Sequence, residues 1–93
     1  MKSKYVVGQI RGEVAGREQL VLAAMVFPET VVHSTVGRRF YGVEGAGFVD
    51  IYPDESAPMG IGITCFGRSE SLNKDSNPER DEQLVRQALG LNY

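Results

Sequence analysis

The sequence predicts an α+β domain: a four-stranded, mostly antiparallel sheet with two helices on one face, in the order β-β-α-β-β-α. Two stretches rich in β-branched and aromatic residues flank a glycine-containing turn early in the chain, and two more flank a proline-rich turn further on. A helix with clear start and stop signals closes the chain. The chain has 93 residues, the length of one domain, which we expect to span positions 1–93.

The first two predicted strands form a hairpin. Lys4–Val14 is rich in Tyr, Val and Ile, which favour strands. Ala15–Glu18 suits a turn because Gly16 accepts a positive φ. Gln19–Phe27 has two interpretations, because its Leu, Ala and Met residues suit a helix whereas its length and continuous apolar character suit a buried strand. We predict a strand, since this segment then pairs with the first one.

A short helix is predicted across 30–40. Val32, Val36 and Phe40 recur at the i, i+4, i+8 spacing of one helical face. The β-branched residues in this segment weaken the prediction, because they lose rotamer freedom in a helix.

Two further strands are predicted at Gly47–Tyr52 and Met59–Phe66, joined by a turn at Pro53–Pro58. In the second of them Cys65 shares a face with two isoleucines, which is the position of a small core residue. The opposite face carries two glycines, which leave bare backbone for a helix or a ligand to approach.

The last helix has the best-defined boundaries. Asn77 precedes Pro78, and a residue before proline avoids the α region, so Asn77 is the expected N-cap. Gly90 is expected to end the helix with Leu91 folding back onto it. The predicted apolar stripe consists of Leu84, Val85, Ala88 and Leu91.

Composition argues against several classes of partner. Ten basic and twelve acidic residues give a net charge of −2, which provides no excess of basic residues to bind DNA or an anionic membrane. Only Arg38 and Arg39 form a local basic spot, able to contact one phosphate. A single cysteine forms no internal disulfide, and the longest apolar run is too short to span a membrane, so we expect a cytoplasmic protein.

No catalytic constellation is evident. His33 and Cys65 are the only imidazole and the only thiol, and Cys65 occupies a core-like position, so a nucleophilic pair is not expected. One histidine and one cysteine also fall short of the ligands of a structural zinc site. We therefore expect no enzyme activity, no metal and no cofactor.

The candidate binding site is the polar segment 67–81, between the end of a strand and the start of the last helix. The amides of that helix N-terminus suit an anion, and the guanidinium of Arg80 in its first turn can grip a phosphate or stack on a base. The alternative is a capped helix beside a solvated loop. The candidate ligand-binding residues are Phe66, Arg68, Ser69, Ser71, Asn73 and Arg80.

Several short motifs together resemble a family of small phage and prophage accessory proteins. The motifs are Phe27-x-Glu29-Thr-Val-x-His33-Ser-x-Val36, Gly45-Ala-Gly-Phe48, Cys65-Phe-Gly-Arg-Ser69-x-Ser71-Leu72 and Ser76-x-Pro78-Glu-x-Asp81. Within this group the chain looks like the Thoeris anti-defence sponges, which oligomerise and sequester signals of the cyclic ADP-ribose type without cleaving them. The resemblance implies ligand contacts at Phe48, in the Ser69–Asn73 loop and at Arg80.

The first functional hypothesis is therefore a non-enzymatic protein of phage type that captures a small nucleotide-derived ligand, such as a cyclic ADP-ribose isomer, in the host cytoplasm. The alternative is a protein–protein module that inhibits a host enzyme through its exposed sheet edges. We also expect a homo-oligomer, because a domain of this size has a small core and gains burial by self-association.

Overall fold

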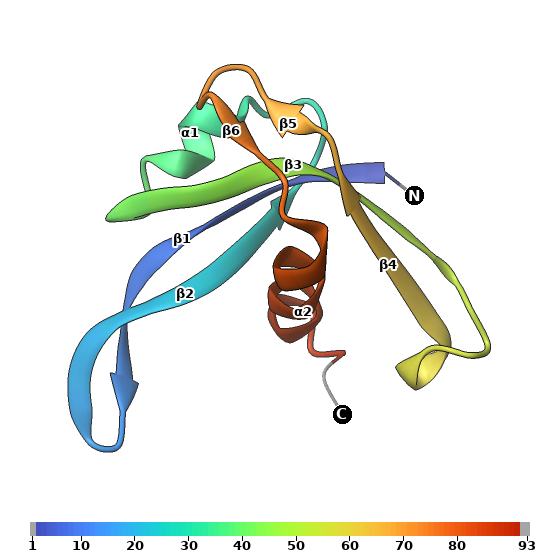
Figure 1. The fold of residues 1–93 in the computed structure, drawn as a ribbon, viewed down its shortest axis with the longest axis horizontal. Helices are drawn as coiled ribbons and strands as arrows, with labels where there is room; N and C mark the ends of the chain where they lie inside the picture. Colours follow the sequence, from blue (N-terminus) through green and yellow to red (C-terminus); the bar gives the residue numbers. More distant parts are fainter. Residues whose placement is uncertain (1, 92–93) are drawn as a thin grey trace.

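The computed structural model describes residues 2–91 and has the predicted α+β architecture (Figure 1). One four-stranded antiparallel sheet has the order β2-β1-β3-β4, and a separate two-stranded hairpin pairs β5 with β6. The elements are β1 (Lys2–Val14), β2 (Arg17–Phe27), α1 (His33–Gly37), β3 (Gly42–Pro53), the 3₁₀ turn η1 (Pro58–Gly60), β4 (Ile61–Phe66), β5 (Arg68–Ser69), β6 (Lys74–Asp75) and α2 (Pro78–Ala88). Within residues 2–91, no helix has the length and apolar character needed to cross a membrane.

The hairpin of β1 and β2 resolves the ambiguous second segment as a strand. Its turn consists of Ala15 and Gly16, with φ values of 52° and 78°. Positive φ at both central residues is the geometry of a type I′ turn, which matches the twist of paired strands. From Val14 opposite Arg17, the register continues without a break to Lys4 opposite Phe27.

The two helices cover opposite faces of the sheet, so the prediction that both lie on one face is wrong. Successive side chains of a strand point to opposite faces. Val7 of β1 therefore packs in one core cluster with Val85 of α2, whereas its neighbour Val6 packs in another with Val36 of α1. Figure 1 shows the curled sheet with α2 in its hollow and α1 on the other side.

The middle of the chain holds less helix and more strand than predicted. The helix predicted for 30–40 is confined to His33–Gly37, and no side chain caps its start. Immediately after it, the amide of Tyr41 donates a hydrogen bond to the carbonyl of Gln9, which draws the chain back to β1. Strand β3 then begins at Gly42, five positions before the predicted Gly47. Within it, Gly45 and Gly47 admit close neighbours that a side chain would exclude.

Helix α2 starts and stops where the sequence predicts. Asn77 is the N-cap and Pro78 the first helical residue. At the other end Gly90 has φ 72°, its amide donates to the carbonyl of Gln87, and the amide of Leu91 donates to that of Arg86. This pair of bonds is a Schellman motif. Leu91 is buried in the core, as predicted.

Candidate binding cleft

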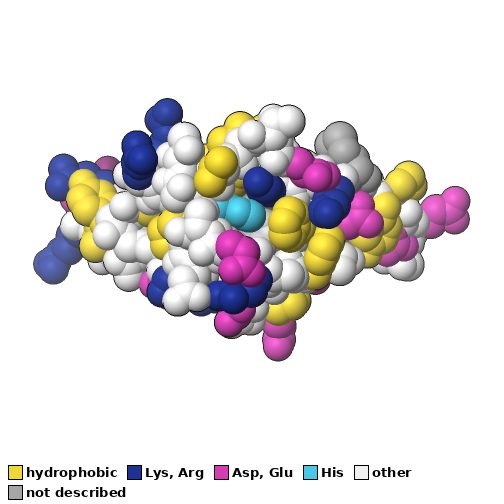
Figure 2. Space-filling model, turned by 90° about the horizontal axis from the view of Figure 1, so that it is seen from above, with side chains coloured by type: hydrophobic (Ala, Val, Ile, Leu, Met, Phe, Trp, Pro, Cys, Tyr) yellow, Lys and Arg dark blue, Asp and Glu magenta, His cyan; other side chains and the backbone are white. Residues whose placement is uncertain are grey.

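An open cleft of about 470 Å³ lies on the α1 face of the sheet. Figure 2 looks onto this face and shows the histidine side chain in a hollow, between basic, acidic and hydrophobic groups. The cleft is contributed by β1, by α1 and the residue before it, by β3 and by the β5–β6 hairpin. We call it the His33 cleft; its lining residues are Lys4, Val32, His33, Phe48, Arg68, Glu70 and Ser71.

The apolar wall of the cleft follows from strand register. Lys4 of β1 lies opposite Phe48 of β3, and Phe48 lies opposite Phe66 of β4. Residues opposite each other in neighbouring strands project from the same face. The two phenyl rings stack with centroids 5.9 Å apart and planes inclined by 26°. A flat aromatic surface therefore stands beside an ammonium group.

His33 lies at the base of the cleft. Its side chain packs between the rings of Phe27 and Phe48, with centroids 5.6 and 5.7 Å away and both rings nearly perpendicular to the imidazole. The ring nitrogen Nε2 lies 2.7 Å from the carbonyl oxygen of Gly47. Only 5% of the residue is exposed, so its ring orientation is fixed by packing and by this hydrogen bond.

The polar segment after β4 forms a hairpin, where the sequence predicted a polar loop without strands. Arg68 of β5 lies opposite Asp75 of β6, and Ser69 lies opposite Lys74. The hydroxyl of Ser69 is fully buried and accepts a hydrogen bond from the amide of Leu72. Short side chains that bond to nearby backbone stabilise tight turns, so Ser69 holds the hairpin and is not open to a ligand.

The cleft carries an excess of positive charge. Lys4 donates to the neutral carbonyl of Val31 at 2.9 Å, and the Lys2 ammonium lies 4.6 Å from the centroid of the Phe48 ring. Arg68 is compensated in part, with carboxylate oxygens of Glu70 and Asp75 at 3.8 and 3.3 Å. The amide oxygen of Asn73 accepts from Arg68 at 2.6 Å and helps to fix the guanidinium. Lys4 is therefore the cleft cation with no acidic partner among residues 2–91.

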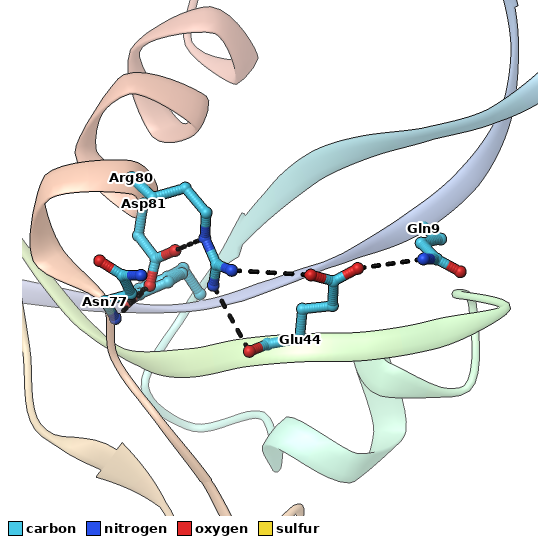
Figure 3. Close-up of polar contacts among 6 residues, drawn as sticks. Gln9, Glu44, Asn77, Arg80 and Asp81 are labelled. Carbon is cyan, nitrogen blue, oxygen red and sulfur yellow. Dashed lines mark hydrogen bonds and ion pairs between the residues drawn. The ribbon is translucent and has the colours of Figure 1, made fainter.

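Arg80 points away from the His33 cleft. It belongs to a polar network on the α2 face, where its Nε donates to the Asp81 carboxylate at 3.0 Å and its Nη1 lies 3.6 Å from the Glu44 carboxylate (Figure 3). Glu44 in turn accepts from the amide group of Gln9 at 3.0 Å.

The start of α2 is likewise occupied by the protein itself. The fully buried Asp81 carboxylate accepts from the amide of Asn77 at 2.8 Å and from the Tyr5 hydroxyl at 2.5 Å. An internal carboxylate at this helix terminus repels a second anion. The expected anion site formed by the amides and Arg80 is thus filled from within the fold.

Burial affects two weak acids in the α2-face core. It raises the pKa of the Tyr5 hydroxyl far above its ordinary range, and the hydrogen bond to Asp81 acts in the same direction. Burial also raises the pKa of the Cys65 thiol from 9.0 to about 12, with the carboxylate of Glu82 adding to the effect. Cys65 lies in this core, 2% exposed, whereas His33 faces the opposite side. The two do not form a nucleophilic pair.

Three of the seven predicted ligand-binding residues line the cleft: Phe48, Arg68 and Ser71. Phe66 extends the aromatic surface, Asn73 positions Arg68, Ser69 is buried, and Arg80 lies on the other face. Sequence reasoning missed Lys4 and placed no ligand at His33. The signal for Lys4 is strand register, which only the paired sheet supplies. His33 is placed by its contacts with Phe27, Phe48 and the carbonyl of Gly47.

Comparison with family models, with curated proteins and with solved structures gave no match. In the part of the chain that the structure describes, no three His, Cys, Asp or Glu side chains are grouped to hold a metal ion.

Proposed function

We propose that the protein is a non-enzymatic binding module that captures a small nucleotide-derived ligand in the His33 cleft. The observation that supports this proposal is the row of Lys4, Phe48 and Phe66 across three neighbouring strands. A stacked phenyl surface suits a base, and an ammonium without an acidic partner suits a phosphate. The volume of about 470 Å³ is within the usual range for small-molecule sites.

The side chains favour binding of the ligand without its chemical conversion. The thiol of Cys65 is buried in the opposite core, and His33 is fixed by a backbone carbonyl and two phenyl rings. The two groups therefore lie on opposite faces of the sheet. The resemblance to phage sponges extends the proposal to cyclic ADP-ribose isomers as ligands and to evasion of host immunity as the biological role.

The test is calorimetric titration with cyclic ADP-ribose isomers, ADP-ribose and AMP. We expect at least one of them to bind, and Lys4→Ala to weaken that ligand by about tenfold, the equivalent of about 1.4 kcal/mol. Lys74→Ala is the matched control, because Lys74 is exposed and lies outside the cleft lining. Absence of heat with every probe, or equal losses in both variants, would contradict the proposal.

The second candidate is an inhibitor that binds a host enzyme by strand addition. Helix α2 hydrogen-bonds the outer edge of β4, through Glu82 to the amide of Cys65 and through Arg86 to the carbonyl of Ile61. No comparable side-chain bond from α2 to the other edge strand, β2, is present within residues 2–91. An uncovered edge offers backbone groups to an incoming strand. Retention of a polypeptide rather than a metabolite by the purified protein would favour this candidate.

A further inference from the structure

We infer that His33 presents an unprotonated Nδ1 to the cleft and so selects ligands that carry an N–H or O–H donor beside their anionic group. This inference deepens the proposed function and rests on it for the ligand. The shared chemistry is a hydrogen-bond donor, which a nucleotide supplies either from a ribose hydroxyl or from an exocyclic amino group on its base.

The tautomer follows from the contact with Gly47. A carbonyl oxygen only accepts hydrogen bonds, so Nε2 at 2.7 Å must carry the proton. In a neutral imidazole the other nitrogen then keeps its lone pair. Nδ1 is accordingly an acceptor that awaits a donor.

Nδ1 is not completely enclosed. No hydrogen bond to Nδ1 is present within residues 2–91, and His33 belongs to the lining of the cleft. Figure 2 shows the histidine ring visible from outside, at the base of the hollow. Because the ring lies between Phe27 and Phe48, its lone pair has a fixed direction.

The groups around the ring complete the selection. Lys4 and Arg68 only donate, the carboxylate of Glu70 only accepts, and the hydroxyl of Ser71 does both. The cations attract the anionic part of a ligand, and Nδ1 accepts from a neutral donor beside it. A bare anion without an N–H or O–H group, such as sulfate, leaves the lone pair unmatched and is expected to bind more weakly than a nucleotide.

The first arm of the test needs no ligand. Long-range ¹H–¹⁵N correlation spectra of the single histidine at pH 8 report which nitrogen carries the proton. We expect the Nε2–H tautomer. A dominant Nδ1–H tautomer would overturn the inference whatever the ligand results are.

The second arm compares AMP, 2′-deoxy-AMP and purine riboside monophosphate, which lacks the amino group, on the wild type and on His33→Gln. Glutamine keeps an N–H where Nε2 donates but has no acceptor at Nδ1. We expect His33→Gln to lose about tenfold in affinity for AMP, and one of the two analogues to be weakened equally on the wild type. The weakened analogue identifies the hydroxyl or the amino group as the donor.

The outcomes separate the two claims. If AMP binds and Lys4→Ala weakens it while His33→Gln does not, the proposed function stands and this inference fails. If neither AMP nor its analogues bind, the proposed function fails for this ligand class, and so does the selection attributed to Nδ1. A Phe27→Leu variant reports separately whether loss of packing against the His33 ring accounts for the effect, because Phe27 lies outside the cleft lining and the variant leaves both imidazole nitrogens in place.

Discussion

At the scale of single residues, Gly47 is a position in the sheet where a close backbone approach can be tested by substitution. A Cβ placed there would lie 2.5 Å from the backbone carbonyl oxygen of Phe66 on the neighbouring strand. Backbone in a central sheet moves little, so Gly47→Ala is expected to lower the free energy of unfolding by about 1–3 kcal/mol. Urea denaturation measures the loss.

Gly42→Ala is the matched control for Gly47→Ala. A Cβ at Gly42 meets only the side-chain oxygen of Gln9, at 3.5 Å, which is ordinary contact. This variant is expected to change the free energy of unfolding by no more than about 0.5 kcal/mol. Equal losses in the two variants would show that the contact with Phe66 is not the cause.

Tyr5 and Cys65 predict a loss of stability at alkaline pH. Both groups are neutral in the fold, with pKa values raised above ordinary values of 10.0 and 9.0. Below pH 9 their contribution is fully present. As pH rises above 9 for Cys65 and above 10 for Tyr5, the unfolded chain releases protons that the folded chain retains, so stability falls by about 1.4 kcal/mol per pH unit for each group.

Urea midpoints measured between pH 8 and pH 11 test this slope. Tyr5→Phe removes one titrating group and should flatten the curve above pH 10, although it also lowers stability at pH 8 because Asp81 loses a donor. The exposed Tyr41→Phe is the control and should leave the wild-type slope in place. A slope unchanged by Tyr5→Phe would refute the assignment.

At the scale of elements, α2 stabilises the sheet through hydrogen bonds of its polar side chains as well as through its apolar stripe. The Glu82 carboxylate accepts from the amide of Cys65 at 3.0 Å. Glu82→Ala leaves that amide without its partner, and we expect a loss of about 1–3 kcal/mol together with faster hydrogen exchange at the Cys65 amide. Gln83→Ala, at an exposed position of the same helix, should change neither measurement.

The sequence predicted best those elements whose signals are local. Asn77-Pro78 and Gly90 mark the ends of α2 by backbone preference alone, and the turn at Gly16 marks the first hairpin. Elements that depend on distant partners were missed or mis-sized. The helix at His33–Gly37 is short because the chain must return to β1, and β5 exists only because Arg68 lies opposite Asp75.

The residues of the candidate site also fall into two groups: those that local composition indicates and those that only distant contacts place. Polar composition drew attention to the segment that contains Arg68 and Ser71, and the structure places both in the lining of the His33 cleft. It could not show that Arg80 turns to Glu44 and Asp81, since that depends on which sheet face α2 covers. Nor could it bring Lys4 beside Phe48, because 44 positions of chain separate them and only the strand register joins them.

At the scale of the whole molecule, the two sheet faces differ in how they are covered. The α2 face holds the larger core cluster and the buried Tyr5–Asp81 contact, which resist opening. The α1 face is covered only by a five-residue helix and a short hairpin, and between them it leaves the cleft. A thin cover over one face is what leaves the cleft open in so small a domain.

Self-association is the prediction that belongs to this scale. The β2 edge carries large apolar side chains in solvent, with Leu20 50% and Met25 37% exposed, and no side chain of α2 hydrogen-bonds that edge in the described residues. Burial of such groups between copies adds the apolar contact that a small core lacks. Multi-angle light scattering at micromolar concentration should therefore give a mass above 10.2 kDa. Leu20→Lys should shift the mass toward the monomer, whereas Val32→Lys, at an equally exposed valine beside the cleft, should not. A monomeric wild type would refute the prediction, and dissociation by both variants would place the contact elsewhere than β2.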